Sequence, residues 1–184
     1  PDGEKPYDRE SAVQHARTYA YNYCSPFNLE MWPADGYWPD CTNFVSQCLW
    51  FGGFDTSKEW HFEQGYYDIR GYHCRHSSSW VNTDAFATWL RTKSGWLSQE
   101  VFKRNWTEDD VKSLTKSVKP GDLIGWIGAN GQITHWAIIT MKDAKGMLYY
   151  TAHTNSRRDR KLSDAIKEGY DDFVIFIIKD DNGL

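Results

Sequence analysis

Apolar positions in the first half of the chain recur every three or four residues, the spacing of amphipathic helices. Asp8, a residue type that caps helices, precedes the first such run. The apolar positions of that run are Ala12, Val13, Ala16, Tyr19 and Ala20. A second run, CTNFVSQCLWF at residues 41–51, ends at a Gly-Gly pair, and a third opens at Asn82 or Thr83. The pattern therefore predicts three helices in this half of the chain.

The period changes in the second half. A short helix is predicted after Thr107, where Asp110 completes a capping pattern. Beyond it, apolar runs are separated by turn residues, and four of them predict strands: DLIGWI, ITHWAIIT, MLYYTAHT and DFVIFIIK. Helices followed by strands indicate an α+β fold, with N-terminal helices packed on an antiparallel β-meander. The 184 residues, 16% of them aromatic, can bury a substantial core, so we expect a single domain over residues 1–184.

Two aromatic-rich stretches, residues 25–39 and 54–80, lack a clear period and are predicted to be loops. The second is long enough to form a wall of a binding site. Exposed aromatic rings beside a cleft commonly stack on sugars or peptides. Trp80, which ends the second stretch, and Trp136 are the candidate substrate-binding residues, although either could equally belong to the core.

Charge and hydropathy exclude two classes of partner. The formal net charge is -4 and the basic residues are dispersed, so we do not expect nucleic acid to bind. The short basic run at residues 157–161 is interpreted as a solvated face. No apolar run approaches the roughly 20 residues that span a bilayer, so we expect no membrane insertion.

The four cysteines, at positions 24, 41, 48 and 74, are dispersed and form no C-x-x-C pair. Cys24 and Cys74 could form a disulfide if the protein is exported. The cluster His73-Cys74-Arg75-His76 contains zinc-ligand residue types but lacks a second pair at ordinary spacing. It is interpreted as a loop, and no metal site is predicted.

Cys41 opens its predicted helix, where backbone N–H groups and the helix dipole lower a thiol pKa and can hold an oxyanion. His135 begins an otherwise apolar strand and suits the role of its general base. The following predicted strand supplies His153 and Asn155, two residues apart and therefore on the same face, and either could orient His135. The alternative interpretation is a buried cysteine and a core histidine.

These residues lie in motifs that resemble a known family. The strings DCTNFVSQCLWFGG, SSSW, GDLIGW, THWAIIT and YYTAHTNSR together resemble the family called Putative amidase domain, of the papain-like clan that includes the CHAP-type cell-wall hydrolases. The resemblance runs from Tyr7 to about Ser163. It implies a papain-like fold with Cys41 as nucleophile and His135 as base. His153 then becomes the preferred orienting residue and Asn155 a supporting polar group.

The resemblance also implies hydrolysis of amide bonds in bacterial peptidoglycan, either as an N-acetylmuramoyl-L-alanine amidase or as a crosslink endopeptidase. We expect a monomer without a cofactor, outside the cell or in the cell wall, either secreted or released by a phage. Some related domains bind calcium, but Asp35 and Asp40 are too sparse to predict such a site. Two alternatives stay open: a papain-like protease or transferase acting on proteins, and a catalytically idle wall-binding module.

Overall fold

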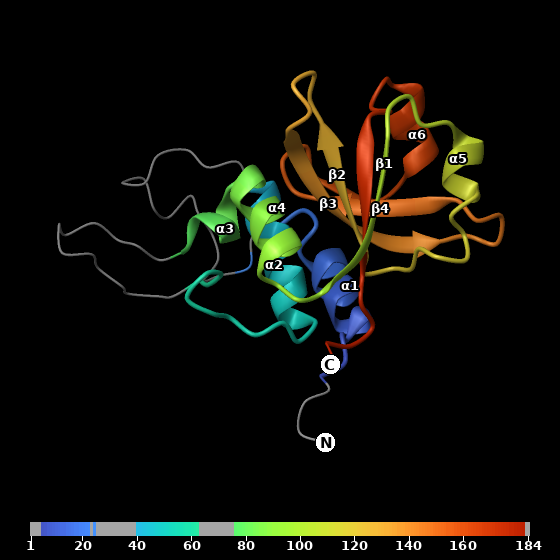
Figure 1. The fold of residues 1–184 in the computed structure, drawn as a ribbon. Helices are drawn as coiled ribbons and strands as arrows, with labels where there is room; N and C mark the ends of the chain where they lie inside the picture. The colour runs from blue at the N-terminus through green and yellow to red at the C-terminus, as the bar shows by residue number, and fades with distance from the viewer. Residues whose placement is uncertain (1–4, 23, 25–39, 63–75, 183–184) are drawn as a thin grey trace.

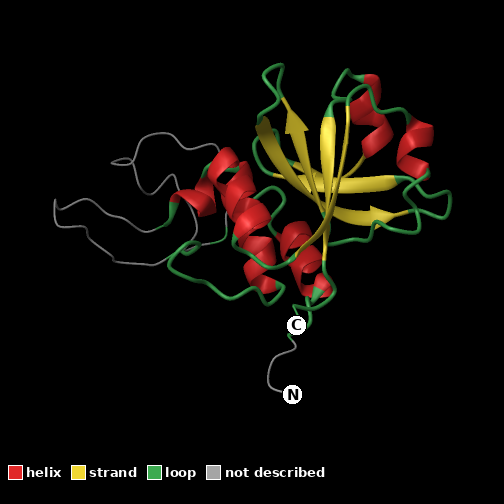
Figure 2. Cartoon of the chain, viewed as in Figure 1, coloured by secondary structure: helices red, strands yellow, loops and turns green. Residues whose placement is uncertain are grey.

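The computed structural model describes residues 5–22, 24, 40–62 and 76–182. The described part contains six helices and six strands (Figures 1 and 2). The helices are α1 (Arg9–Thr18), α2 (Cys41–Phe51), α3 (Ser78–Val81), α4 (Thr83–Thr92), α5 (Glu108–Lys112) and α6 (Leu162–Lys167). The strands are β1 (Leu97–Lys103), β2 (Leu123–Ile127), β3 (Ile133–Lys142), β4 (Leu148–Ala152), β5 (Arg157–Lys161) and β6 (Phe173–Ile178).

The strands form one antiparallel sheet in the order β1-β6-β2-β3-β4-β5. Strands β2 to β5 follow one another as a meander, but β6 returns to lie between β1 and β2. The prediction of an α+β fold is confirmed, whereas the prediction of a simple meander is wrong for the last strand. Strand β6 is buried at every position except the half-buried Ile177, as expected of an inner strand.

The sheet separates two groups of helices. Figure 1 shows α1 to α4 gathered on one side and α5 and α6 on the other. One core cluster joins α1, α2 and α4 to the inward residues of β3 and β6, among them Trp136 and Phe176. A second cluster joins α5 and α6 to the opposite face, among them Trp126 and Phe173. Because helices cover both faces of the sheet, the central strands carry apolar side chains on both faces.

The helix starts follow the predicted capping chemistry. The Asp8 side chain accepts from Ser11 N, and Asn82 accepts from the first-turn N–H groups of α4. Thr107 and Asp110 form a complete capping box. Three predicted helices therefore have the expected N-termini, because capping depends only on residues that are close together in the sequence.

Arg9 fixes α1 to the sheet. Its guanidinium donates to Asp122 Oδ1 (2.9 Å), to the carbonyl of Ile178 (2.6 Å) and to that of Pro120 (3.1 Å). The Asp122 side chain is fully buried and also accepts from the backbone N–H groups of Lys119 and Ile178. The start of α1 is thus held at the ends of β2 and β6.

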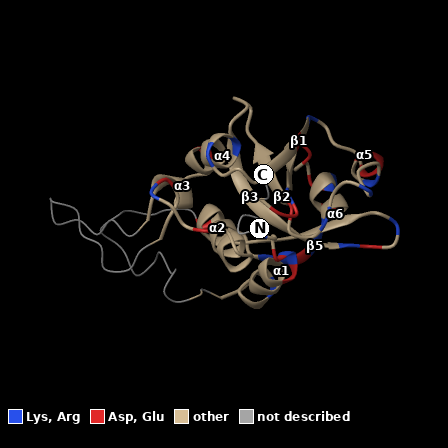
Figure 3. Cartoon of the chain, turned by 60° about the horizontal axis from the view of Figure 1, so that its bottom comes forward, with Lys and Arg blue, Asp and Glu red and all other residues tan. Residues whose placement is uncertain are grey.

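Basic and acidic residues occur together on several of the described helices. In Figure 3, α1 and α5 each carry basic and acidic residues. The 157–161 run forms β5, where Arg160 pairs with Glu168 (2.7 Å). Among the described residues, no helix is both long and apolar enough to cross a membrane.

Candidate active site around Cys41

Cys41 is the first residue of α2, as predicted. Its side chain is covered, with 1% of the residue exposed. The sulfur receives hydrogen bonds from the backbone N–H groups of Trp136 and Thr42, and it lies 3.8 Å from the Thr42 hydroxyl. Helix α2 therefore places the thiol against β3, at the residue that follows His135.

Burial raises the pKa of the Cys41 thiol, because desolvation outweighs the hydrogen bonds from Trp136 and Thr42 that lower it. The neighbouring Asp40 charge raises it further. The expectation of a lowered thiol pKa at a helix start is therefore wrong for this structure. The helix N-terminus stabilises thiolate only where the loss of hydration is smaller than its own effect.

His135 lies on β3 opposite Trp126 of β2, and the two rings are 5.4 Å apart. Its side chain is half-buried, and desolvation lowers its pKa to about 4. Within residues 5–22, 24, 40–62 and 76–182, no hydrogen bond joins His135 to Cys41 or to His153. The structure thus brings the Cys41 sulfur to the backbone beside His135 without a direct bond between the two side chains.

His153 has different partners from those predicted. One ring nitrogen, Nδ1, makes a short hydrogen bond to Asp40 Oδ2, and Nε2 bonds to the backbone carbonyl of Tyr19. The ring also stacks on Phe44, with centroids 4.0 Å apart. The prediction that His153 orients His135 is therefore wrong in this arrangement, since both of its ring nitrogens face other groups.

Asp40 is the residue that the sequence argument missed. It immediately precedes Cys41 and occupies the N-cap position of α2. Its position next to a cysteine at a helix start was visible in the sequence, but its partner His153 is 113 residues away. Only the fold brings the two side chains together.

Asn155 does not share a strand face with His153. Strand β4 ends at Ala152, and residues 153–156 form the turn into β5. Thr154 and Asn155 both have a φ of 61°, and Asn155 is exposed whereas His153 is buried. The prediction of Asn155 as a supporting active-site residue is not supported, because the turn carries it away from the ring of His153 and into solvent.

Trp80 and Trp136, the predicted substrate-binding residues, are both fully buried. The indole of Trp80 donates to Asn43 Oδ1 (2.9 Å), and that of Trp136 donates to the carbonyl of Thr83 (3.1 Å). Neither ring can stack on a substrate from these positions. Sequence alone could not distinguish Trp80 from a surface aromatic residue, because three serines, Ser77 to Ser79, precede it.

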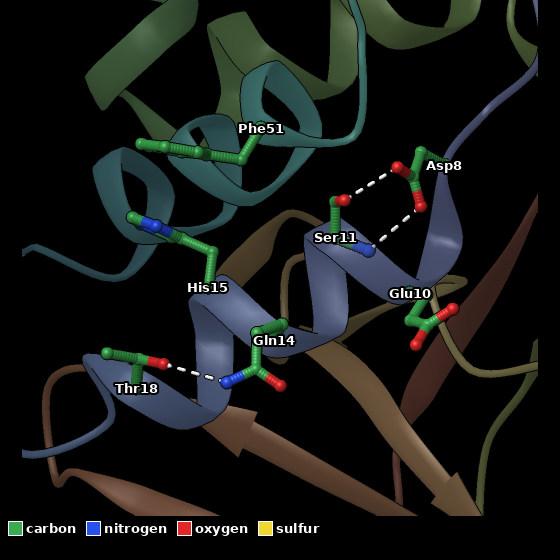
Figure 4. A pocket seen from close by; sticks show the side chains of 7 residues that line it. All are labelled: Asp8, Glu10, Ser11, Gln14, His15, Thr18 and Phe51. Atoms are coloured by element: carbon green, nitrogen blue, oxygen red, sulfur yellow. Dashed lines mark hydrogen bonds between the residues drawn. The ribbon is translucent and has the colours of Figure 1, made fainter.

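The described surface also contains a shallow groove of about 440 Å³ over α1 and the end of α2 (Figure 4). It is lined by Asp8, Glu10, Ser11, Gln14, His15, Thr18 and Phe51. His15 stacks on Phe51 at 4.0 Å and bonds to Gln47 (3.1 Å). None of the predicted catalytic residues lines this groove, so it is separate from the Cys41 site.

The described residues contain no group of three or more side chains suited to hold a metal ion. Residues 73–75 of the His73-Cys74-Arg75-His76 cluster, and Cys74 as a partner for Cys24, lie outside the described part of the chain. The predicted loop and the Cys24–Cys74 pairing therefore stay predictions.

Comparison with known proteins identifies a family. The family model described as Putative amidase domain matches residues 6–177, nearly the whole chain. No solved structure shows a significant match.

Two relatives from Bacillus subtilis (strain 168) also match. The chain is 28% identical over 159 residues to the uncharacterized protein YhbB, covering 85% of this chain and 44% of that protein. It is 29% identical over 161 residues to the uncharacterized protein YjcM, covering 83% of this chain and 32% of that protein. The chain thus spans less than half the length of these relatives.

Proposed function

Because the chain belongs to the family described as Putative amidase domain, we propose that it is a cysteine-dependent amide hydrolase with a papain-like, CHAP-related fold. Cys41 is the nucleophile and His135 the general base. The observation that carries this proposal is the seating of the Cys41 sulfur, at the start of α2, against the backbone N–H of Trp136. That contact brings the sulfur to the peptide bond between His135 and Trp136. The proposal also requires the His135 ring, which lies beside Trp126, to approach the sulfur when substrate binds.

The pKa values define how the reaction starts. At pH 7 the raised pKa of Cys41 and the His135 pKa of about 4 leave both groups neutral. The proton of the thiol therefore passes to His135 as sulfur attacks the amide carbonyl carbon. A sulfur–carbon bond forms, and the carbonyl electron pair moves to oxygen. Backbone N–H groups at the start of α2 stabilise that oxyanion.

The second half of the reaction restores the enzyme. The carbon–nitrogen bond breaks, and the imidazolium of His135 gives its proton to the leaving amine. Water then attacks the thioester, with His135 accepting one of its protons and returning it to sulfur. The products are an amine and a carboxylate, and no cofactor is required.

We propose bacterial peptidoglycan as the substrate, cleaved either at the N-acetylmuramoyl-L-alanine amide or at a peptide crosslink. The protein would act as a monomer outside the cell or in the cell wall. This choice rests on the resemblance of the motifs around Cys41 and His135 to those of CHAP-type enzymes. Protein substrates, cut by a protease or transferase with the same two residues, are the second enzymatic candidate.

One observation favours a non-catalytic module instead. A cysteine with 1% exposure and a raised pKa has the properties of an ordinary core residue. The burial of Trp60 and Trp80 weighs against a glycan-binding role, since their rings do not reach the surface. The hydrolase proposal requires that the groups covering Cys41 move when substrate enters.

The test is digestion of purified Gram-positive peptidoglycan by the wild-type protein and by Cys41→Ser and His135→Ala. Turbidity follows lysis, and mass spectrometry identifies the new ends. Cys48→Ala is the matched control, because Cys48 lies on the same helix but is packed in the core. Circular dichroism checks that each variant is folded.

We expect clearing, new amines and intact glycan with the wild type and the control only. The masses of the products would name the bond. Full activity of folded Cys41→Ser would refute the mechanism. Cleavage of a protein panel without release from any wall would support the protease alternative, and binding to the wall without cleavage of either substrate would support the idle module.

A further inference from the structure

A chain of partly or fully buried hydrogen bonds runs close to Cys41. His153 lies between the Asp40 carboxylate and the Tyr19 carbonyl. The other oxygen of Asp40 accepts from Asn43 Nδ2 (2.7 Å), and Asn43 Oδ1 accepts from the indole of Trp80 (2.9 Å). The chain thereby joins the end of α1, the start of α2, helix α3 and the turn after β4.

The chemistry of these partners assigns a charge to His153. A carboxylate and a backbone carbonyl are both acceptors, so with Asp40 ionised both ring nitrogens donate. Only the imidazolium form has two N–H groups. The side chains of His153 and Asp40 are 6% and 13% exposed, so the two form a nearly buried ion pair. A buried ion pair is rarely better for stability than apolar residues, which suggests another role.

That role follows from the position of Asp40. An aspartate at an N-cap normally accepts from backbone N–H groups in the first turn of its helix. Asp40 makes no such capping bond. Its two oxygens are occupied by His153 and the Asn43 amide, while the backbone N–H of Thr42 is directed at the Cys41 sulfur.

We propose that His153 is a positioning residue that holds the Asp40 carboxylate away from the first turn of α2, so that the N–H groups there serve the Cys41 sulfur and the oxyanion. This inference rests on the proposed function, since it assigns His153 a part in the same reaction. His153 acts through Asp40 and not through His135. Without it, the carboxylate turns to the helix start, occupies the donors and places an uncompensated negative charge beside the thiol.

Among the described residues, His15 of α1 is a second titratable group coupled to His153. Burial lowers the His15 pKa, its bond to Gln47 opposes this, and the charge of His153 adds a smaller lowering. His15 bonds to Gln47, and within the described part of the chain no hydrogen bond joins His15 to the Asp40 carboxylate. Asp40 is therefore the group that responds first when His153 is replaced.

The test measures the rate at which iodoacetamide alkylates Cys41, resolved by peptide mass mapping across a pH series. This readout needs no substrate, so it separates the inference from the proposed function. His153→Phe removes the charge while keeping a ring against Phe44. The double variant His153→Phe with Asp40→Asn also removes the carboxylate that has lost His153 as its partner. Cys48, buried on the same helix, is an internal control for opening of α2.

In His153→Phe we expect Cys41 alkylation at pH 7 to fall about tenfold relative to wild type, which corresponds to a rise of about one unit in the thiol pKa. Adding Asp40→Asn should restore most of the rate. A purely structural role gives the opposite result, because a loosened fold exposes a covered thiol and raises alkylation of Cys41 and Cys48 together.

Unchanged or faster Cys41 alkylation in His153→Phe, or no recovery in the double variant, would overturn the inference. If the predicted alkylation pattern appears while the wild type cleaves no amide, the positioning role stands and the proposed function fails. If the wild type cleaves peptidoglycan and His153→Phe cleaves it with an unchanged kcat, the positioning role fails and the function stands. A loss of kcat in His153→Phe that is recovered when Asp40→Asn is added supports both the positioning role and the proposed function.

Discussion

Replacement of Arg9 by methionine should destabilise the protein through one buried carboxylate. The Asp122 side chain is fully buried, whereas that of Arg9 is 16% exposed. Methionine keeps most of the apolar stem of arginine but removes its charge and its donors. Asp122 would then keep only the backbone N–H groups of Lys119 and Ile178 as partners.

Breaking a buried ion pair by removing one partner costs about 3–5 kcal/mol, because a buried charge is left uncompensated. Two backbone N–H groups still donate to Asp122, so we expect the free energy of unfolding to fall by an amount at the lower end of that range, about 3 kcal/mol at pH 7. The assay is equilibrium unfolding in urea. In the Asp122→Asn background the same Arg9→Met change should cost less, with a coupling of about 0.5–3 kcal/mol.

The loss should also depend on pH. Burial raises the pKa of Asp122 and Arg9 opposes that rise, so removing Arg9 raises the pKa further. A folded-state pKa above the unfolded value means that the destabilisation is absent at low pH, where the carboxyl is protonated in both states. It grows as the pH rises through the folded-state pKa. The difference between Arg9→Met and wild type should therefore be smaller at pH 4 than at pH 7.

Arg91→Met is the matched control, because the Arg91–Glu100 pair is much more exposed (41% and 31%) than the Arg9–Asp122 pair and should contribute less than about 1 kcal/mol. The reasoning is refuted if Arg9→Met costs no more than Arg91→Met. Equal costs of Arg9→Met in the wild-type and Asp122→Asn backgrounds would also refute it, since the carboxylate would then play no part.

Three further predictions concern Trp80, Asn155 and Asp110. Trp80→Phe should lower the free energy of unfolding by about 1–3 kcal/mol, measured by urea unfolding, because it removes the buried indole N–H that donates to Asn43. Unchanged stability with weakened binding to the cell wall would favour the substrate-binding interpretation instead. Asn155→Gly should keep full hydrolytic activity and change stability by less than about 0.5 kcal/mol, because glycine suits its left-handed turn; a large loss of kcat in peptidoglycan assays would return Asn155 to the active site. The hydrogen bond from Lys103 and, to a smaller extent, those from Thr107 lower the pKa of Asp110 to about 2. The stabilising effect of the Asp110 carboxylate is therefore present above the ordinary pKa of an aspartate and is lost as the pH falls through about 2. Thermal melts of Asp110→Asn should therefore fall below wild type at pH 6 and converge with it near pH 2, and a gap independent of pH would contradict this.

Four of the six described helices, α1, α2, α4 and α5, could be predicted because the responsible residues are neighbours in the chain, whereas the short helices α3 and α6 were missed. Asp8 and Thr107 bond within three residues of themselves. Strand β5 was not predicted, because RRDRK carries no apolar alternation and pairs with β4 through its backbone. Strand β1 was also missed, since most of its residues are exposed.

The candidate site was predictable only in part, for a related reason. The position of Cys41 at a helix start depends on local sequence, and it was correct. The partners of His153 depend on which elements meet in space. Periodicity placed Asn155 on a continuing strand, but two residues with positive φ end that strand at Ala152 and reverse the chain. The burial of Trp80 likewise follows from tertiary packing.

The place of β6 has a consequence for how the molecule assembles. The last strand in the sequence pairs with both β1 and β2 near the middle of the sheet. During synthesis β2 to β5 can pair as successive hairpins, but β1 has no neighbour until residues 173–178 leave the ribosome. The backbone N–H of Tyr7 also donates to the carbonyl of Asp180, so the segment that leads into α1 is secured at the same late moment. A chain that is truncated before residue 173 would leave unpaired strand edges and exposed core residues, and we expect it to aggregate rather than form a smaller stable domain.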